Sequence, residues 1–141
     1  MASLGSINTT TDMLTNDDAF AQNVGVLSRT GSINLKVAAT TNLYTVPSAR
    51  VAVVTSVIIR VTAATAFTVA PTAGIGIAAG ESDIMQSTSL LGLIILGGLY
   101  GYSCEGYFVS GVASDIIKLG INVGATATTA TGEVTLIGYL I

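Results

Sequence analysis

The segment RVAVVTSVIIRV, residues 50–61, decides the fold class. Its odd positions hold Val51, Val53, Val57, Ile59 and Val61, and its even positions hold Ala52, Val54 and Ile58. Alternation with a period of two is typical of a β-strand, and apolar residues on both faces indicate a strand that is covered on both sides. We therefore expect a central strand of a β-sandwich, with Arg60 at the point where the strand approaches solvent.

Shorter segments with strand character lie on either side of this one. We expect strands at residues 33–37, 42–46, 66–69, 74–77, 90–96, 99–109, 115–123 and 133–140, with a hairpin turn at Gly97 and Gly98. The pair 66–69 and 74–77 brackets Pro71 and is either two short strands or one broken strand. About eight strands with frequent turns predict an all-β fold, a jelly-roll β-sandwich.

The first 30 residues differ from the rest of the chain. They are mostly polar, and their isolated apolar residues include Leu14, Phe20, Val24 and Val26. Such a segment buries too little apolar surface to fold alone. We expect residues 1–30 to form an extended N-terminal arm that becomes ordered by docking, or else a frayed terminus, and residues 31–141 to form one sandwich domain.

The composition excludes most enzyme mechanisms. The chain has no His, no Trp, one Cys and 9% charged residues, whereas 50% of its residues are hydrophobic. General acid–base and nucleophilic catalysis draw mainly on His, paired carboxylates or an activated Cys. Neither the glycines at 74, 76 and 80 nor the carboxylates Glu81 and Asp83 have the spacing of a phosphate loop or a calcium site. We expect no catalytic residue, no metal and no cofactor.

Charge and hydropathy narrow the choice of partners. The net charge is −3, and the five basic residues are scattered, so nucleic-acid binding is not expected. The N-terminus has no secretory pattern, which predicts synthesis in a cytoplasm. The mean hydropathy is high, at +0.74. However, the apolar run at 90–102 is shorter than the roughly 20 residues of a spanning helix. We therefore expect surface buried against partner subunits rather than a membrane span, with a membrane-active protein as an alternative.

Four segments of the chain carry a resemblance to a known family. They are LYTVP at 43–47, VTSVIIRVT at 54–62, DIIKL at 115–119 and LIGYL at 136–140. In this order they resemble a family of small virion proteins of tailed phages, over roughly residues 33–141. The resemblance implies a jelly roll that forms a homotrimer and binds the major capsid protein on the outer surface of the phage head, as a cement or decoration protein without enzymatic activity. Such modules also occur in head fibres and tail spikes.

Two parts of the chain depart from that family pattern. The segment 90–102 is apolar where a polar variable loop is ordinary, and the N-terminal arm has no counterpart. We interpret the first as a trimer seam and the second as a capsid contact. The seam candidates are Leu91, Leu93, Ile95, Tyr100 and Tyr102, and the capsid-contact candidates are Leu14, Phe20, Val24 and Val26. The alternative function is a receptor-binding or fibre-tip module that recognises a glycan on the host surface.

Overall fold

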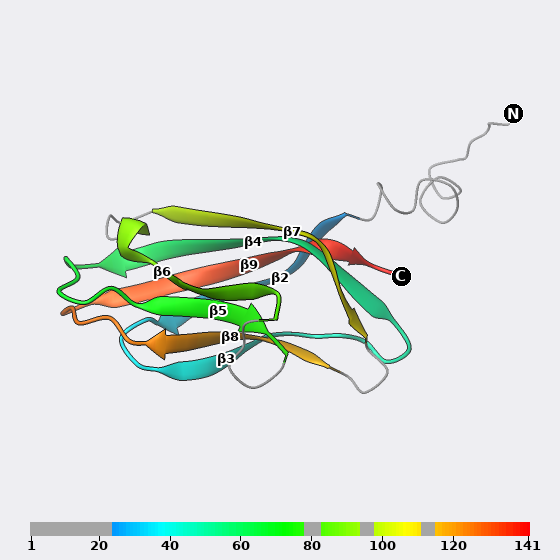
Figure 1. Cartoon of the computed structure of the whole chain (residues 1–141), viewed down its shortest axis with the longest axis horizontal. Helices are drawn as coiled ribbons and strands as arrows, with labels where there is room; N and C mark the ends of the chain where they lie inside the picture. Colours follow the sequence, from blue (N-terminus) through cyan, green and yellow to red (C-terminus); the bar gives the residue numbers. More distant parts are fainter. Residues whose placement is uncertain (1–23, 78–82, 94–97, 111–114) are drawn as a thin grey trace, which may run out of the picture.

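The computed structural model is an all-β molecule and describes residues 24–77, 83–93, 98–110 and 115–141 (Figure 1). Its strands are β2 (Gly25–Asn34), β3 (Ala39–Thr45), β4 (Val51–Ala64), β5 (Thr72–Gly76), β6 (Met85–Ser89), β7 (Leu99–Ser110), β8 (Ile116–Val123) and β9 (Ala130–Leu140). One turn of 3-10 helix, η1 (Leu91–Leu93), precedes β7. In the described part of the chain, no helix is long and apolar enough to cross a membrane.

The strands form two four-stranded antiparallel sheets, in the orders β2-β9-β4-β7 and β3-β8-β5-β6. Four of the strand pairs are β2 with β9, β3 with β8, β4 with β7 and β5 with β6. In each pair an early strand meets a late one, so the chain forms one long antiparallel hairpin whose turn lies between β5 and β6. The pairs β4 with β9 and β5 with β8 then join the rolled hairpin into two sheets. This connectivity is that of a jelly roll, so the expected fold class is confirmed.

The hydrophobic core lies between the two sheets. Strand β4 has two hydrogen-bonded neighbours, as expected for the central strand, and it contributes Ala52, Val54, Val57, Ile59 and Val61 to the core. Strand β9 places Val134 and Leu136 opposite β4, and β8 supplies Ile117, Leu119 and Ile121 from the other sheet. The core residues alternate along β8 and β9, so each of these strands buries one face against the opposite sheet. In β4 a register shift between Val54 and Ser56 interrupts the alternation, so that the core residues are even-numbered before it and odd-numbered after it. The expectation that the odd positions of 51–61 share one face is therefore wrong.

The two ends of the sandwich differ in which segments form them. The described residues of the connections 35–38, 65–71, 90–98 and 124–129 lie at the end on the left of Figure 1, which we call the distal end. The described residues of the connections 46–50, 77–84 and 111–115 lie at the opposite end, together with both ends of the described chain, which we call the terminal end. Successive strands run in opposite directions, so the connections alternate between these two ends.

The expected strand at 33–37 is wrong beyond Asn34. There the chain turns, and Lys36 N donates to Asn34 Oδ1 at 2.9 Å, which stabilises the turn. Leu35 N donates to Ala130 O at 3.0 Å, and Leu35 O accepts from Ala125 N at 2.7 Å. These bonds tie the backbone of Leu35 to Ala125 of the β8–β9 connection and to Ala130 at the start of β9, and they hold its buried side chain in the core.

The expected hairpin of 90–96 with 99–109 is also wrong. Residues 91–93 form η1, and β7 pairs with β4. The polar residues that precede η1 form β6, which pairs with β5. Leu90 and Leu93 are both buried, so the apolar character of this segment reflects core packing around a short turn. Residues 94–97, which include the end of the expected strand and Gly97, lie outside the described residues.

Two element boundaries in the structure differ from those predicted from the sequence. Strand β2 begins at Gly25 and pairs with β9, so residues 25–30, which we expected in the arm, lie in the first sheet. The segment 66–69, which we expected to be a strand, forms only an isolated bridge between Val69 and Thr126. The strand expected at 74–77 is β5, which begins at Thr72, directly after Pro71.

Candidate functional site

The structure divides the residues that we assigned to a trimer seam. Leu93 is only 4% exposed and belongs to the core, and Tyr100 and Tyr102 are partly buried and pack against the core. Leu91 is 59% exposed. Ile95 lies outside the described residues. Of the described candidates, Leu91 therefore offers the most side-chain surface to a neighbouring molecule.

The assigned capsid-contact residues lie at the terminal end, as far as they are described. Val24 and Val26 are both exposed, and Val26 reaches 65%. Gly25 between them pairs with Gly138 of β9, and the exposed Ile141 exchanges backbone hydrogen bonds with Val51 at the same end of this sheet. Leu14 and Phe20 lie outside the described residues.

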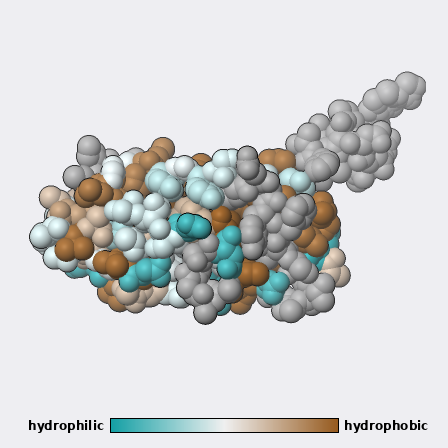
Figure 2. Space-filling view, viewed as in Figure 1, coloured by the Kyte–Doolittle hydropathy of each residue, from teal (hydrophilic) through white to brown (hydrophobic). Residues whose placement is uncertain are grey.

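The distal end carries more exposed apolar side chains than sequence reasoning identified. Of the eight large apolar residues that are exposed in the described chain, five are at this end: Val37, Val69, Leu91, Leu99 and Val123. Covering a half-exposed Val or Leu is worth about 1 kcal/mol at ~25 cal/mol per Å². Figure 2 shows a surface mainly of brown, tan and white residues over this left-hand end. These five residues are the candidates for an interaction surface at this end.

Backbone hydrogen bonds fix the distal connections to one another. Thr68 N donates to Thr126 O at 2.8 Å, and Thr126 N donates to Val69 O at 3.0 Å. A Cβ on Gly124 would lie 2.2 Å from Lys36 O, so only glycine lets these two connections approach so closely. The apolar residues are therefore presented on a hydrogen-bonded surface that needs little ordering when a partner binds.

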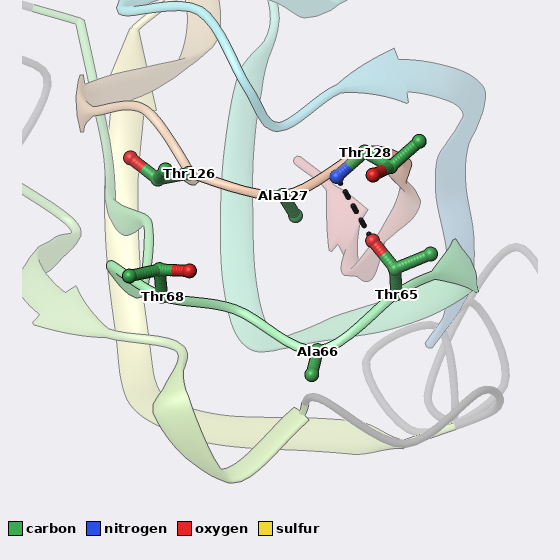
Figure 3. Close-up of a pocket in the computed structure, with 6 residues that line it drawn as sticks. All are labelled: Thr65, Ala66, Thr68, Thr126, Ala127 and Thr128. Carbon is green, nitrogen blue, oxygen red and sulfur yellow. Dashed lines mark hydrogen bonds between the residues drawn. The ribbon is translucent and has the colours of Figure 1, made fainter.

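A groove runs between two of these connections (Figure 3). Its lining residues are Thr65, Ala66, Thr68, Thr126, Ala127 and Thr128, around a volume of about 470 Å³. Thr65 Oγ1 accepts hydrogen bonds from Thr128 N at 2.9 Å and from Thr129 N at 3.2 Å. The Thr65 hydroxyl therefore joins the two connections at one end of the groove and has a structural role. None of the six lining residues is aromatic or charged, which leaves this groove without a stacking platform for a sugar.

Charge is distributed unequally between the two ends. In the sequence of the four distal connections, Lys36 is the one charged residue, and its Nζ donates to Thr128 O at 2.9 Å. The three terminal connections contain Arg50, Glu81, Asp83 and Asp115, and residues 1–24 add Asp12, Asp17 and Asp18 without any Lys or Arg. Residues 25–141 hold five basic and five acidic residues, so the net charge of −3 belongs to the N-terminal segment.

The described ion pairs lie on the outer face of the first sheet. Arg29 of β2 donates a hydrogen bond from Nη2 to Glu133 Oε1 of β9 at 2.9 Å, and Arg60 Nε of β4 forms an ion pair with the same oxygen at 3.0 Å. The hydrogen bond from Arg29 holds the pKa of Glu133 below its ordinary value, and the charges of both arginines act in the same direction against desolvation. This cluster joins three neighbouring strands and contributes to the sheet rather than to a reaction. Within the described ranges, no group of three or more His, Cys, Asp or Glu residues is placed to hold a metal ion.

Comparison with known proteins gives one structural similarity. No family model matches the chain, and no curated protein matches it. Among solved structures, the chain is similar to a chain of the "Cyanophage Pam1 capsid asymmetric unit", with a TM-score of 0.56 and 15% sequence identity. The similarity covers 83% of this chain and 84% of that chain, so the two chains have nearly the same length. At this identity the similarity shows a shared fold.

Proposed function

We propose that this chain is a structural protein of a phage virion, a cement or decoration protein that binds the outer surface of the head as a trimer and stabilises it. The observation that carries the proposal is the jelly roll, which is similar over 83% of this chain to a chain of similar size in a phage capsid asymmetric unit. The sequence resemblance to small virion proteins of tailed phages points in the same direction. The protein is made in the host cytoplasm and acts on the assembled head.

The physical properties of the sandwich suit this role. A cement protein needs weak contacts at fixed positions, because several copies bound to a symmetric site multiply modest affinities through effective concentration. The two hydrogen-bonded sheets supply the fixed geometry. No chemical step is required of any residue, which agrees with a chain that has no His and few charged residues.

In this proposal the N-terminal arm contacts the major capsid protein. The arm carries the apolar anchors Leu14 and Phe20 together with the three aspartates, and it joins the sandwich at the exposed pair Val24 and Val26. Because its charge is of one sign, a basic strip on the shell is the complementary surface.

The proposal is tested by binding to heads of the phage that encodes the chain. Heads prepared without the protein are mixed with the full-length chain or with a variant that lacks residues 2–23, and co-sedimentation is measured. This deletion ends before β2, so the sandwich keeps all its strands. We expect the full-length chain to saturate the heads and the deletion to lose at least tenfold in affinity. Absence of binding by the full-length chain would refute the function, and unchanged binding of the deletion would refute the role of the arm.

A second measurement addresses the trimer. Light scattering on a sizing column should give a native mass equal to three copies of the 14.2 kDa chain. A monomer at every concentration, together with single copies bound to heads, would contradict this part of the proposal.

A further inference from the structure

We infer that a pocket at the terminal end of the sandwich binds the N-terminal segment of the same chain, through residues 17–20, in the free protein. The pocket has a volume of about 290 Å³ and lies between the start of β2 and the end of β9, where both ends of the described chain are found (Figure 1). Its lining includes Val26 and Leu27 of β2, Leu140 of β9, and Arg50 from the connection between β3 and β4.

The pocket combines an apolar surface with one cation. Val26 is 65% exposed, whereas Leu27 and Leu140 are partly buried and pack against the core. Arg50 is exposed, and the ion pairs in the described part of the chain all involve Glu133, so the Arg50 guanidinium has no ion pair there. An arginine beside apolar side chains suits a ligand in which a carboxylate lies next to an aromatic group.

Backbone hydrogen bonds fix the position of Arg50 beside the pocket. Arg50 N donates to Pro47 O at 3.1 Å and closes a turn, within which Ala49 has a φ of 63°. The next residue, Val51, exchanges two backbone hydrogen bonds of 2.9 Å with Ile141. The backbone of Arg50 therefore needs little further ordering when a carboxylate binds to its side chain.

The segment that precedes β2 carries the complementary groups. Residues 1–24 contain three aspartates and no Lys or Arg, so these carboxylates have no cation within their own segment. The sequence DDAF, residues 17–20, places two of them next to an aromatic ring. A carboxylate of this sequence can form a charge-assisted hydrogen bond with Arg50 while the Phe20 ring covers Val26.

The place where this segment joins the sandwich favours it over other acidic partners. Val24 directly precedes β2, and Gly25 lines the pocket, so the chain leaves the sandwich at the pocket itself. From Phe20 to Gly25 the chain spans at most about 18 Å, which keeps the ring close to the pocket. A tethered group has an effective concentration of roughly millimolar, whereas a group on another molecule lacks this advantage.

Docking in the pocket and the proposed contact with the shell use the same segment at different stages. In the free protein the pocket covers Phe20 and pairs the neighbouring carboxylates with Arg50. On the head, a basic strip of the shell replaces Arg50 as the partner of the carboxylates. The pocket thus holds the arm until the shell is present.

Nuclear Overhauser effects (NOEs) in the full-length free chain test the inference. We expect NOEs from the Phe20 ring to the methyl groups of Val26 and Leu140. In Arg50→Gln these NOEs should fall about threefold or more, because apolar contact alone then holds the segment. Lys36→Gln is the control, since it removes an exposed cation at the distal end, and the NOEs should keep their intensity.

A charge exchange separates the ion pair from any general effect of Arg50 on the fold. Arg50→Asp should abolish the NOEs from Phe20, and combining it with Asp17→Arg/Asp18→Arg should restore them. Circular dichroism shows whether each variant keeps its strands. A folded combined variant without the NOEs would overturn the inference.

Samples that mix chains with labelled methyl groups and chains with protonated Phe identify which chain supplies the segment. We expect NOEs within one chain. NOEs only between different chains would assign the pocket to a neighbouring copy and overturn the inference. Absence of any NOE from Phe20 to the pocket, or unchanged NOEs in Arg50→Gln, would also overturn it.

These measurements are independent of the proposed function, because they are made without heads. Failure of the chain to bind heads refutes the proposed function, while the NOEs still decide whether the pocket holds the N-terminal segment.

Discussion

The distal and terminal ends of this sandwich are closed by similar numbers of connections, yet they differ in chemistry. The distal end presents five exposed apolar side chains and, in its four connections, one charge. The terminal end carries charges of both signs in its connections, and the acidic N-terminal segment begins there. The comparison teaches that a chain with few charged residues can still present two chemically different ends, because its charges are concentrated in particular connections and in the N-terminal segment.

The largest loss of stability is expected from a substitution between the two interior strands of the first sheet, because it destabilises the whole sandwich. A Cβ on Gly138 would lie 2.0 Å from Val53 O, inside the pairing of the two interior strands β4 and β9. Gly138→Ala should therefore lower the free energy of unfolding by about 3 kcal/mol or more. Gly101→Ala in β7 is the control, because a Cβ there has no atom within 4 Å. Similar unfolding midpoints in denaturant for the two variants would contradict the register described here.

The next effect should be confined to the distal end. Gly124→Ala forces the connection at 124 away from Lys36, and we expect a loss of about 2 kcal/mol in stability. Gly92→Ala, at the same end with open space around its Cβ, serves as the control, and denaturant unfolding measures both variants. If Gly124→Ala had the stability of the unmodified chain, the connections that contain Gly124 and Lys36 would not be in close contact.

A smaller loss of stability, independent of both ends of the sandwich, is expected when Glu133 is replaced. Its pKa is lowered in the folded chain, so its ionised form stabilises the fold above the ordinary glutamate pKa, and this contribution disappears as the pH falls through the lowered value. Glu133→Gln should lower the thermal midpoint slightly at pH 7 and not at all in strong acid. Thermal unfolding between pH 7 and pH 3 measures this, with Lys118→Gln as a charge control. A difference that is constant across the pH range would contradict the role of the ion pairs.

The smallest effect should be a gain in stability at the terminal end. Ala49 lies in the connection between β3 and β4 with a φ of 63°, a conformation that favours glycine. Ala49→Gly should raise the free energy of unfolding by up to about 1 kcal/mol, reduced by the greater entropy of glycine in the unfolded chain. Denaturant unfolding checks the sign, and native mass should stay constant. A clear loss of stability would show that Ala49 does not hold this conformation.

Sequence periodicity predicted interior strands such as β4 and β9 and also the edge strands β3 and β7. Burial alternates along β9, whereas in β4 the register shift between Val54 and Ser56 changes the parity of the core residues, which periodicity did not predict. Periodicity failed at Leu35 and at 90–93, where buried residues sit in turns stabilised by backbone bonds to distant connections. Alternation of apolar residues reports burial, and it does not distinguish a strand from a turn that is tied into the core.

The interaction surfaces were less accessible to sequence reasoning than the fold. Leu91, one of the predicted seam residues, is exposed, whereas Leu93, two residues later, belongs to the core. Val37, Val69 and Val123 were missed because they lie far apart in the chain, and only the jelly-roll connectivity brings their connections to one end. The separation of charge was readable in the sequence, since residues 1–24 contain three aspartates and no basic residue.

A cryo-electron microscopy reconstruction of heads from the phage that encodes this chain tests the central claim most directly. The account predicts jelly-roll density on the outer surface of the shell, in groups of three, with the N-terminal segments reaching the major capsid protein. Heads saturated with the protein but without such density, or density for this chain only at the tail, would contradict the assignment as a cement protein.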